Sequence, residues 1–187
     1  PLLVDEAYAE IPGKFAKLRE LVIQAVDARS KIIVWTSFVK NADWLHERLA
    51  EFGAVKVHGG VELSDRNNAI SAFKTDPSVK VLVATPGAAK EGLTLTVANH
   101  AVFYDRSFSL DDYLQAQDRI HRISQTDPCF IWNLISLESI DEWVDSLLAA
   151  KRLSAQLGQA DISKEEYRRL ASYDFGKMIR EILRLEP

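Results

Sequence analysis

Strand patterns and amphipathic helical patterns alternate along the first three-quarters of the chain. Largely apolar runs rich in β-branched and aromatic residues are typical of strands that are covered on both faces in a parallel sheet. These runs and one shorter segment predict strands at residues 31–36, 55–58, 79–84, 100–105 and 130–137. Apolar residues at spacings of three and four predict helices over 15–28, 41–52, 64–73 and from about residue 110. Gly53 is the predicted stop of the second helix, and Ser64 is the predicted cap of the third. The alternation predicts a doubly wound, mainly parallel α/β sheet with helices on both faces.

The last fifty residues have a different character, because no strand pattern follows residue 139. Apolar positions beginning at Ile140 predict a long amphipathic helix. A turn with a capped helix start is predicted at 161–166, and a final helix at 175–185. We therefore expect three parts: an N-terminal extension (1–10), an α/β lobe (11–138) and a C-terminal helical appendage (139–187). The apolar face of the appendage is expected to pack on the lobe, and the alternative is that it docks a protein partner.

The composition limits the classes of function. The 187 residues are 47% hydrophobic without a run long enough to cross a membrane, so we expect a soluble globular protein with no membrane partner. The net charge of −4 argues against nucleic-acid binding by the whole surface but permits a local basic track. The single cysteine, Cys129, is expected to be a buried inert thiol in an intracellular protein. That compartment would be the cytoplasm, associated with the nucleoid in a bacterium, or the nucleus in a eukaryote. A start at Pro1 suggests a piece of a longer protein.

Residues 115–125 carry two arginines three positions apart within a helical pattern. The pattern predicts one apolar face, formed by Tyr113, Ala116, Ile120 and Ile123. It also predicts a second stripe, formed by Gln115, Arg119 and Arg122 and aimed away from the core. Two planar guanidinium groups on one face suit a chain of phosphates, whereas the simpler alternative is a solvated helix with an ion pair between Asp118 and Arg122.

The loops that follow the predicted strands are the other candidate sites, because ligands of open parallel sheets bind beyond the carboxyl ends of the strands. Residues 36–41, 58–60, 85–92 and 105–107 supply hydroxyl groups, small residues and backbone donors that suit phosphate oxygens. No G-x-x-x-x-G-K-[ST] phosphate loop and no Asp-Glu-x-His run occurs, and the four histidines lack metal-ligand spacing. The chain therefore has the features of half of a phosphate-handling active site.

The order of these segments resembles the C-terminal RecA-like lobe of superfamily 2 helicases, within them the Swi/Snf group of double-stranded DNA translocases. The resemblance runs from about residue 13 to 151, with motif IV at 31–38, the following block at 58–60 with Arg66 and Phe73, and motif V at 85–95. Motif VI at 115–125 is the most specific, because it reads Gln-Ala-x-x-Arg-x-His-Arg-Ile-x-Gln. Departures from the group are a motif V one residue longer than usual, Phe108-Ser109 in place of Trp-Asn-Pro, and Ser124 in place of glycine.

The resemblance implies a division of roles among these residues. Arg119 and Arg122 would be arginine fingers for the γ-phosphate of ATP, held with most of its magnesium by the N-terminal RecA-like lobe of the same protein. The residues implied near the nucleotide are Glu91, Gly92 and Thr94 (near the ribose), together with Gln115 and Gln125, which would orient the two arginines or contact polar neighbours. The residues implied on DNA phosphates are Thr36, Ser37, Lys40, Arg66 and Thr85.

The predicted function is accordingly the second motor lobe of an ATP-dependent double-stranded DNA translocase, with little ATPase activity in the isolated chain. Two alternatives stay open: the same lobe of an RNA-directed helicase, and a catalytically silent lobe kept for nucleic-acid or protein binding.

Overall fold

The computed structural model describes residues 11–89 and 94–170 of the chain. The chain divides into two compact units, residues 1–135 and residues 136–187, and each is described by itself below. The division falls close to the boundary at 138/139 that the sequence predicts.

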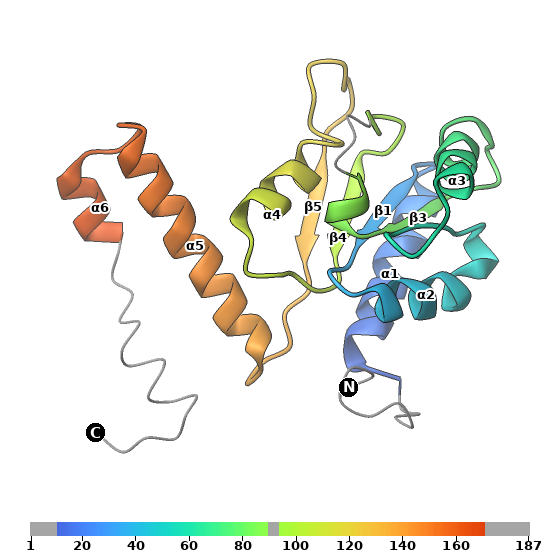
Figure 1. The fold of residues 1–187 in the computed structure, drawn as a ribbon, viewed down its shortest axis with the longest axis horizontal. Coiled ribbons are helices and arrows are strands. Elements are labelled where there is room, and N and C mark those ends of the chain that lie inside the picture. The colour runs from blue at the N-terminus through green and yellow to red at the C-terminus, as the bar shows by residue number, and fades with distance from the viewer. Residues whose placement is uncertain (1–10, 90–93, 171–187) are drawn as a thin grey trace. The chain divides into compact units, whose positions relative to one another are not determined.

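A five-stranded parallel sheet forms the centre of the first unit (Figure 1). Its strands are β1 (Ile32–Trp35), β2 (Val55–Val57), β3 (Val81–Ala84), β4 (His100–Phe103) and β5 (Phe130–Asn133), in the spatial order β2-β3-β1-β4-β5. All four strand pairings are parallel, and every residue of β1, β3 and β4 is buried. The predicted doubly wound α/β fold is confirmed, although β5 ends at Asn133 and not at residue 137.

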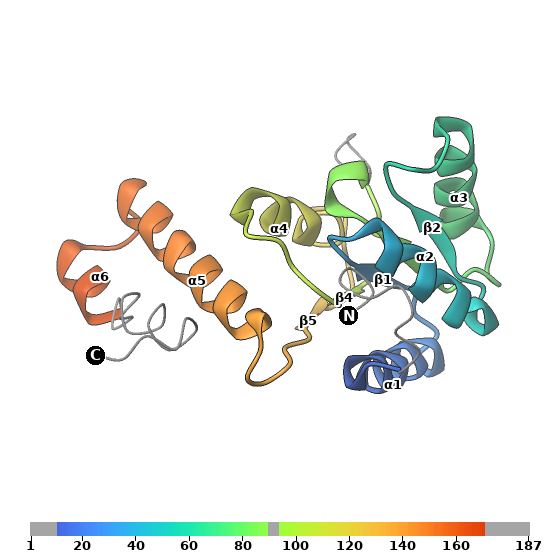
Figure 2. The same ribbon diagram turned by 60° about the horizontal axis from the view of Figure 1, so that its bottom comes forward.

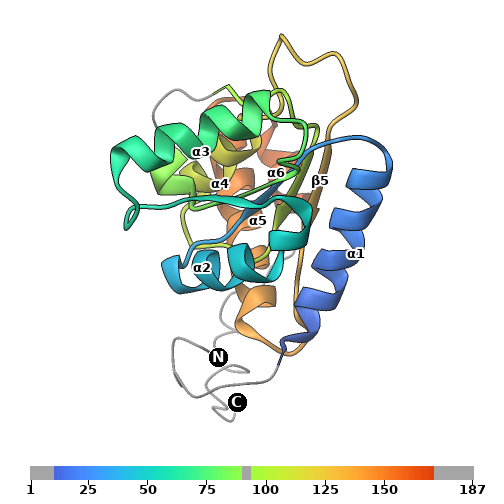
Figure 3. The same ribbon diagram turned by 90° about the vertical axis from the view of Figure 1, so that its right-hand side faces the viewer.

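Helices cover both faces of this sheet (Figures 2 and 3). On one face, α1 (Gly13–Asp27) and α2 (Val39–Arg48) pack through fully buried leucines such as Leu18 and Leu45. On the other face, α3 (Leu63–Thr75) and α4 (Leu110–Gln117) contribute Phe73 and Ala116 to a second core. Burial of each large apolar side chain stabilises the fold by roughly 1.5–3 kcal/mol, so these two cores fix the sheet and the loops at its edges.

Two local predictions about helix ends have opposite outcomes. Gly53 adopts the left-handed conformation (φ 64°) directly after the 3₁₀ turn Ala50–Phe52, so the predicted stop after the second helix is confirmed. A Cβ atom at this position would overlap the carbonyl oxygen of Ser78. The prediction that Ser64 caps α3 is wrong, because α3 begins at Leu63 with Glu62 at the N-cap and no side chain caps it.

The second unit contains α5 (Ile140–Gly158) and α6 (Lys164–Leu170). Ser139 caps α5 by accepting a hydrogen bond from the backbone N–H of Asp141 (3.2 Å), and Ser163 accepts one from Glu166 (3.1 Å). The predicted long helix and capped helix start are thus confirmed. The extension 1–10 and the helix expected at 175–185 lie outside the described residues, and packing of the appendage on the lobe stays a prediction. Among the residues described, no helix is long and apolar enough to span a membrane.

Candidate functional site

The helix that begins motif VI is shorter than its sequence pattern predicts. α4 ends at Gln117, and residues 118–124 form turns and bends. The backbone N–H of Arg119 bonds to Ala116 (3.3 Å), three residues back, which tightens the last turn. The carbonyl oxygen of Arg119 then accepts from Leu95 (3.1 Å), a residue of motif V, so it is engaged outside the helix. This long-range bond gives a physical reason for the helix to end where it does.

The shorter helix changes which side chains face the core. Ala116 and Ile120 are buried as predicted, but Ile123 is fully exposed (108%), so its predicted packing in the core is wrong. Arg119 is only 8% exposed, so the prediction that it is aimed away from the core is also wrong. Burial lowers the pKa of Arg119, the nearby charge of Arg122 lowers it further, and Asp118 opposes both effects. Gln115 is exposed on α4, and the three polar residues therefore do not form one stripe.

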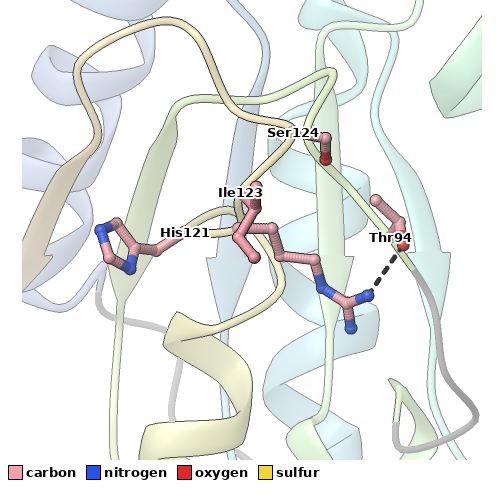
Figure 4. Close-up of a pocket in the computed structure, with 5 residues that line it drawn as sticks. Thr94, His121, Ile123 and Ser124 are labelled. Carbon is pink, nitrogen blue, oxygen red and sulfur yellow. Dashed lines mark hydrogen bonds between the residues drawn. The ribbon is translucent and has the colours of Figure 1, made fainter.

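Arg122 lies at an open pocket of about 620 Å³ that is lined by Thr94, His121, Arg122, Ile123 and Ser124 (Figure 4). Its Nη1 donates to the hydroxyl oxygen of Thr94 (3.0 Å), the dashed contact in Figure 4, and its Nε donates to the carbonyl oxygen of Asp118 (3.1 Å). Arg122 thus contacts Asp118 through the backbone, whereas the simpler alternative from the sequence was a pair with the carboxylate. Within the part of the chain that the structure describes, these bonds use two of the five N–H donors of Arg122, so three remain for an oxyanion.

Gln125 joins the end of motif VI to the segment that follows motif V. Its side-chain nitrogen donates to the carbonyl oxygens of Thr96 (3.2 Å), Ala98 (3.0 Å) and Ile120 (3.4 Å). Its side-chain oxygen accepts from the backbone N–H of Asp127 (3.1 Å). Because the amide is engaged at both ends by the backbone, the geometry favours a role in positioning the turn over direct contact with a nucleotide.

Asp105, which follows β4, organises the loop after the neighbouring strand β1. Its carboxylate accepts from the hydroxyl of Thr36 (2.5 Å), the backbone N–H of Ser37 (2.6 Å) and the side-chain amide of Asn41 (3.0 Å). Thr36 is fully buried, so its side chain supports the loop from inside and has no exposed atom for a phosphate. Ser37 is partly exposed, and Lys40 is exposed on the first turn of α2. Sequence reasoning missed this role of Asp105, although an aspartate directly after a buried strand was a signal for it.

A second polar network holds the turn after β2. The ring of His58, which is buried, lies with Nε2 at 3.0 Å from a carboxylate oxygen of Asp43, and its Nδ1 accepts from the backbone N–H of Gly60 (3.1 Å). Lys56 bonds to the same oxygen of Asp43 (2.5 Å). Burial would raise the pKa of Asp43, but the hydrogen bonds from Lys56 and His58 outweigh it, so the pKa is lowered. The network thereby fixes the turn at residues 59–60 beside α2.

The remaining predicted residues are placed as follows. Thr85 is buried at the carboxyl end of β3, and Arg66 is half-buried on α3, where its Nε has no hydrogen-bond partner among the described residues. Glu91 and Gly92 lie outside the described residues. The parallel register brings Thr36, His58, Thr85 and Asp105 to the same edge of the sheet. No group of side chains that could hold a metal ion occurs within residues 11–89 and 94–170.

The sequence of residues 13–124 matches the family described as the helicase conserved C-terminal domain. This chain belongs to that family. Its match covers motif V and all of motif VI except Gln125, and these two segments meet at Arg122 and Thr94. The predicted resemblance is therefore confirmed, and the lobe is of the Swi2/Snf2 type, as the relatives below indicate.

Curated relatives of this helicase C-terminal lobe are much longer than the chain. It is 30% identical over 151 residues to human lymphoid-specific helicase, and the aligned region covers 80% of this chain and 18% of that protein. It is 30% identical over 142 residues to the ATP-dependent helicase FUN30 of Saccharomyces cerevisiae, covering 74% of this chain and 13% of that protein. The chain therefore spans less than a fifth of the length of either relative.

Solved structures show the same fold. The C-terminal part of the Fun30 ATPase domain has a TM-score of 0.68 and 29% identity, covering 73% of this chain and 45% of that chain. The Sulfolobus solfataricus SWI2/SNF2 ATPase core in complex with dsDNA has a TM-score of 0.66 and 29% identity, covering 93% of this chain and 39% of that chain. More than half of that ATPase core thus lies outside the region that this helicase lobe matches.

Proposed function

We propose that this chain is the second motor lobe of an ATP-dependent double-stranded DNA translocase. The proposal is based on the position of Arg122. Its side chain lines an open pocket, two of its nitrogens are held by hydrogen bonds, and N–H donors remain for a ligand. A partner lobe, absent from these residues, would bring ATP and most of the magnesium to this pocket. The relatives named as ATP-dependent helicases support the use of ATP.

Arg122 would act by charge. Phosphoryl transfer spreads negative charge over the oxygens of the γ-phosphate, and a guanidinium placed there stabilises the transition state, an effect of roughly 10³–10⁵ in rate in other enzymes. Arg119, buried in the lobe, would have to expose its side chain to touch the same phosphate. We therefore propose Arg122 as the first contact with the phosphate and Arg119 as a second arginine finger. While Arg119 stays buried, its positive charge lies near Arg122.

The DNA contacts would lie along the carboxyl edge of the sheet. Ser37, Lys40, Arg66 and Thr85 are the proposed contacts, with Thr36 supporting Ser37 from the interior through Asp105. Hydroxyl groups, backbone N–H groups and cationic side chains bind the phosphate backbone without reading its sequence. The structural relative named as an ATPase core in complex with dsDNA supports this choice of nucleic acid.

The nucleic-acid specificity and the need for a partner lobe can be tested together. The rate of ATP hydrolysis is measured for the full-length protein with duplex DNA, single-stranded DNA and structured RNA, and for the isolated 187-residue chain with duplex DNA. The proposal predicts strongest stimulation by duplex DNA and almost no hydrolysis by the isolated chain. Stimulation by RNA alone would identify an RNA-directed helicase, and no hydrolysis by the full-length protein with any nucleic acid would identify a catalytically silent lobe.

We propose a nuclear compartment. The curated relatives named above come from human and yeast and support a nuclear protein over a bacterial, nucleoid-associated one. Imaging of the tagged full-length protein in its own cells tests this assignment.

A further inference from the structure

The segment at residues 94–98 and the segment at residues 119–125 are joined by four hydrogen bonds. The backbone contributes one bond, from Leu95 to Arg119 (3.1 Å), and Gln125 contributes two, to the carbonyl oxygens of Thr96 and Ala98. The fourth is the bond from Arg122 to the hydroxyl of Thr94 (3.0 Å). The first three fix the backbone of motif VI against motif V and the segment that follows it, and of the four only the last acts on the guanidinium itself.

Arg122 needs this restraint because its helix does not supply one. α4 ends at Gln117, so Arg122 lies in a turn, and its neighbour Ile123 is fully exposed and gives no packing. A long side chain in an exposed turn populates many rotamers, and fixing it costs conformational entropy. Two hydrogen bonds, from Nε to Asp118 and from Nη1 to Thr94, hold the planar guanidinium at two of its three nitrogens. They define its plane, and among the described residues they use no N–H donor of Nη2.

We propose that Thr94 is the positioning residue of Arg122, which orients the guanidinium for the oxyanion that the pocket receives. This inference rests on the proposed function and deepens it. It replaces the expectation that Thr94 stands near a ribose, since its hydroxyl oxygen already accepts a bond from Arg122 (Figure 4). Thr94 would act in catalysis only through Arg122 and would contribute nothing to ATP binding by itself.

The test uses the full-length protein at saturating duplex DNA, with kcat and KM for ATP measured separately. Thr94→Val removes the hydroxyl and keeps the shape, so kcat is expected to fall about 10-fold, because a hydrogen bond to a charged group contributes about one factor of ten or more. KM for ATP is expected to change less than about two-fold, since Thr94 is not expected to contact bound ATP in the ground state. Thr94→Ser, which keeps the hydroxyl, is expected to recover most of kcat.

The matched control is Thr75→Val, which removes an exposed hydroxyl that bonds only locally to Ser71 at the end of α3. It is expected to leave both constants unchanged. If Thr94→Val unfolds, as judged by circular dichroism, Thr94→Ala serves in its place beside Thr94→Ser. A kcat for Thr94→Val equal to that of the wild type, or a Thr94→Ser variant as slow as Thr94→Val, would overturn the inference.

A double-mutant cycle with Arg122→Ala separates this inference from the proposed function. If Thr94 acts through Arg122, Thr94→Val causes no further loss in the Arg122→Ala background, measured in single turnovers. An equal loss in both backgrounds would refute the positioning role while leaving Arg122 as the finger. An Arg122→Ala variant with normal kcat would instead refute the proposed function and the inference with it.

Discussion

Asp105 gives the sharpest stability prediction, because one carboxylate holds three groups of the loop that carries the proposed DNA contacts. Asp105→Ala removes the acceptor for the hydroxyl of Thr36, the backbone N–H of Ser37 and the amide of Asn41. Thr36 is fully buried, so water cannot replace its lost partner without rearrangement of the loop. The perturbation therefore combines lost bonds with a buried hydroxyl proton on Thr36 that is left without an acceptor, while the hydroxyl oxygen still accepts from the backbone N–H of Phe38 (3.4 Å).

The magnitude follows from these contacts. A hydrogen bond to a charged group contributes roughly 1.5–3 kcal/mol, and an unsatisfied buried group costs about 1–3 kcal/mol. The bonds are not additive, and the partly exposed Ser37 and Asn41 regain water, so we expect the free energy of unfolding to fall by about 3 kcal/mol. Asp105→Asn keeps one acceptor oxygen, and its amide can donate to Thr36, so its expected cost is about 1 kcal/mol.

The assay is urea unfolding of this chain followed by tryptophan fluorescence, because three of its four tryptophans lie in the α/β unit. The control is Asp27→Ala, which removes an exposed carboxylate at the end of α1 and is expected to change stability by less than about 0.5 kcal/mol. An Asp105→Ala variant as stable as the Asp27→Ala control would refute the view that this carboxylate organises the loop.

The other predictions concern a turn, an exposed apolar side chain and a buried histidine. Gly53→Ala is expected to lower the free energy of unfolding by about 2 kcal/mol or more in urea, because the backbone there is left-handed and the added Cβ atom would overlap a carbonyl oxygen. Gly59→Ala is the control, since its Cβ atom would meet nothing within 4 Å. Equal losses for the two variants would contradict this prediction. Ile123→Ser is expected to leave unfolding unchanged within about 0.5 kcal/mol, since the side chain is fully exposed; a loss above about 2 kcal/mol would restore its predicted place in the core. Burial lowers the pKa of His100 below 6.5, so the unfolded state binds its proton more readily and stability falls as the pH drops from about 7 through the folded pKa. His100→Phe, which can keep the stacking with its aromatic neighbours, is expected to reduce this loss in unfolding measured at pH 7 and pH 5, and an unchanged pH dependence would exclude His100 as its source.

The fold was predictable because its signals are local. β1, β3 and β4 are buried on both faces, and burial on both faces produces the uninterrupted apolar runs that identify parallel strands. The motifs likewise fall after strands whose register brings their ends to one edge of the sheet.

The geometry around Arg122 was not predictable, because long-range bonds decide it. The helical spacing of apolar residues continues to Ile123, but the carbonyl oxygen of Arg119 is taken by Leu95, 24 positions earlier in the sequence, and the helix stops. Asp105 likewise acts on residues 64 to 69 positions away. No periodicity along the chain reports such contacts.

The central claim is that Arg122 completes an ATPase site whose nucleotide is held by another lobe. The most direct measurement is kcat for ATP hydrolysis of the full-length protein at saturating duplex DNA, for Arg122→Ala beside Arg19→Ala. The control removes an arginine of α1 that is paired with Glu51. ATP binding is measured in parallel with a fluorescent nucleotide analogue. The account predicts a loss of roughly 10³–10⁵ in kcat for Arg122→Ala with nucleotide still bound, and an unchanged kcat for Arg19→Ala. Near-normal hydrolysis by Arg122→Ala would contradict it.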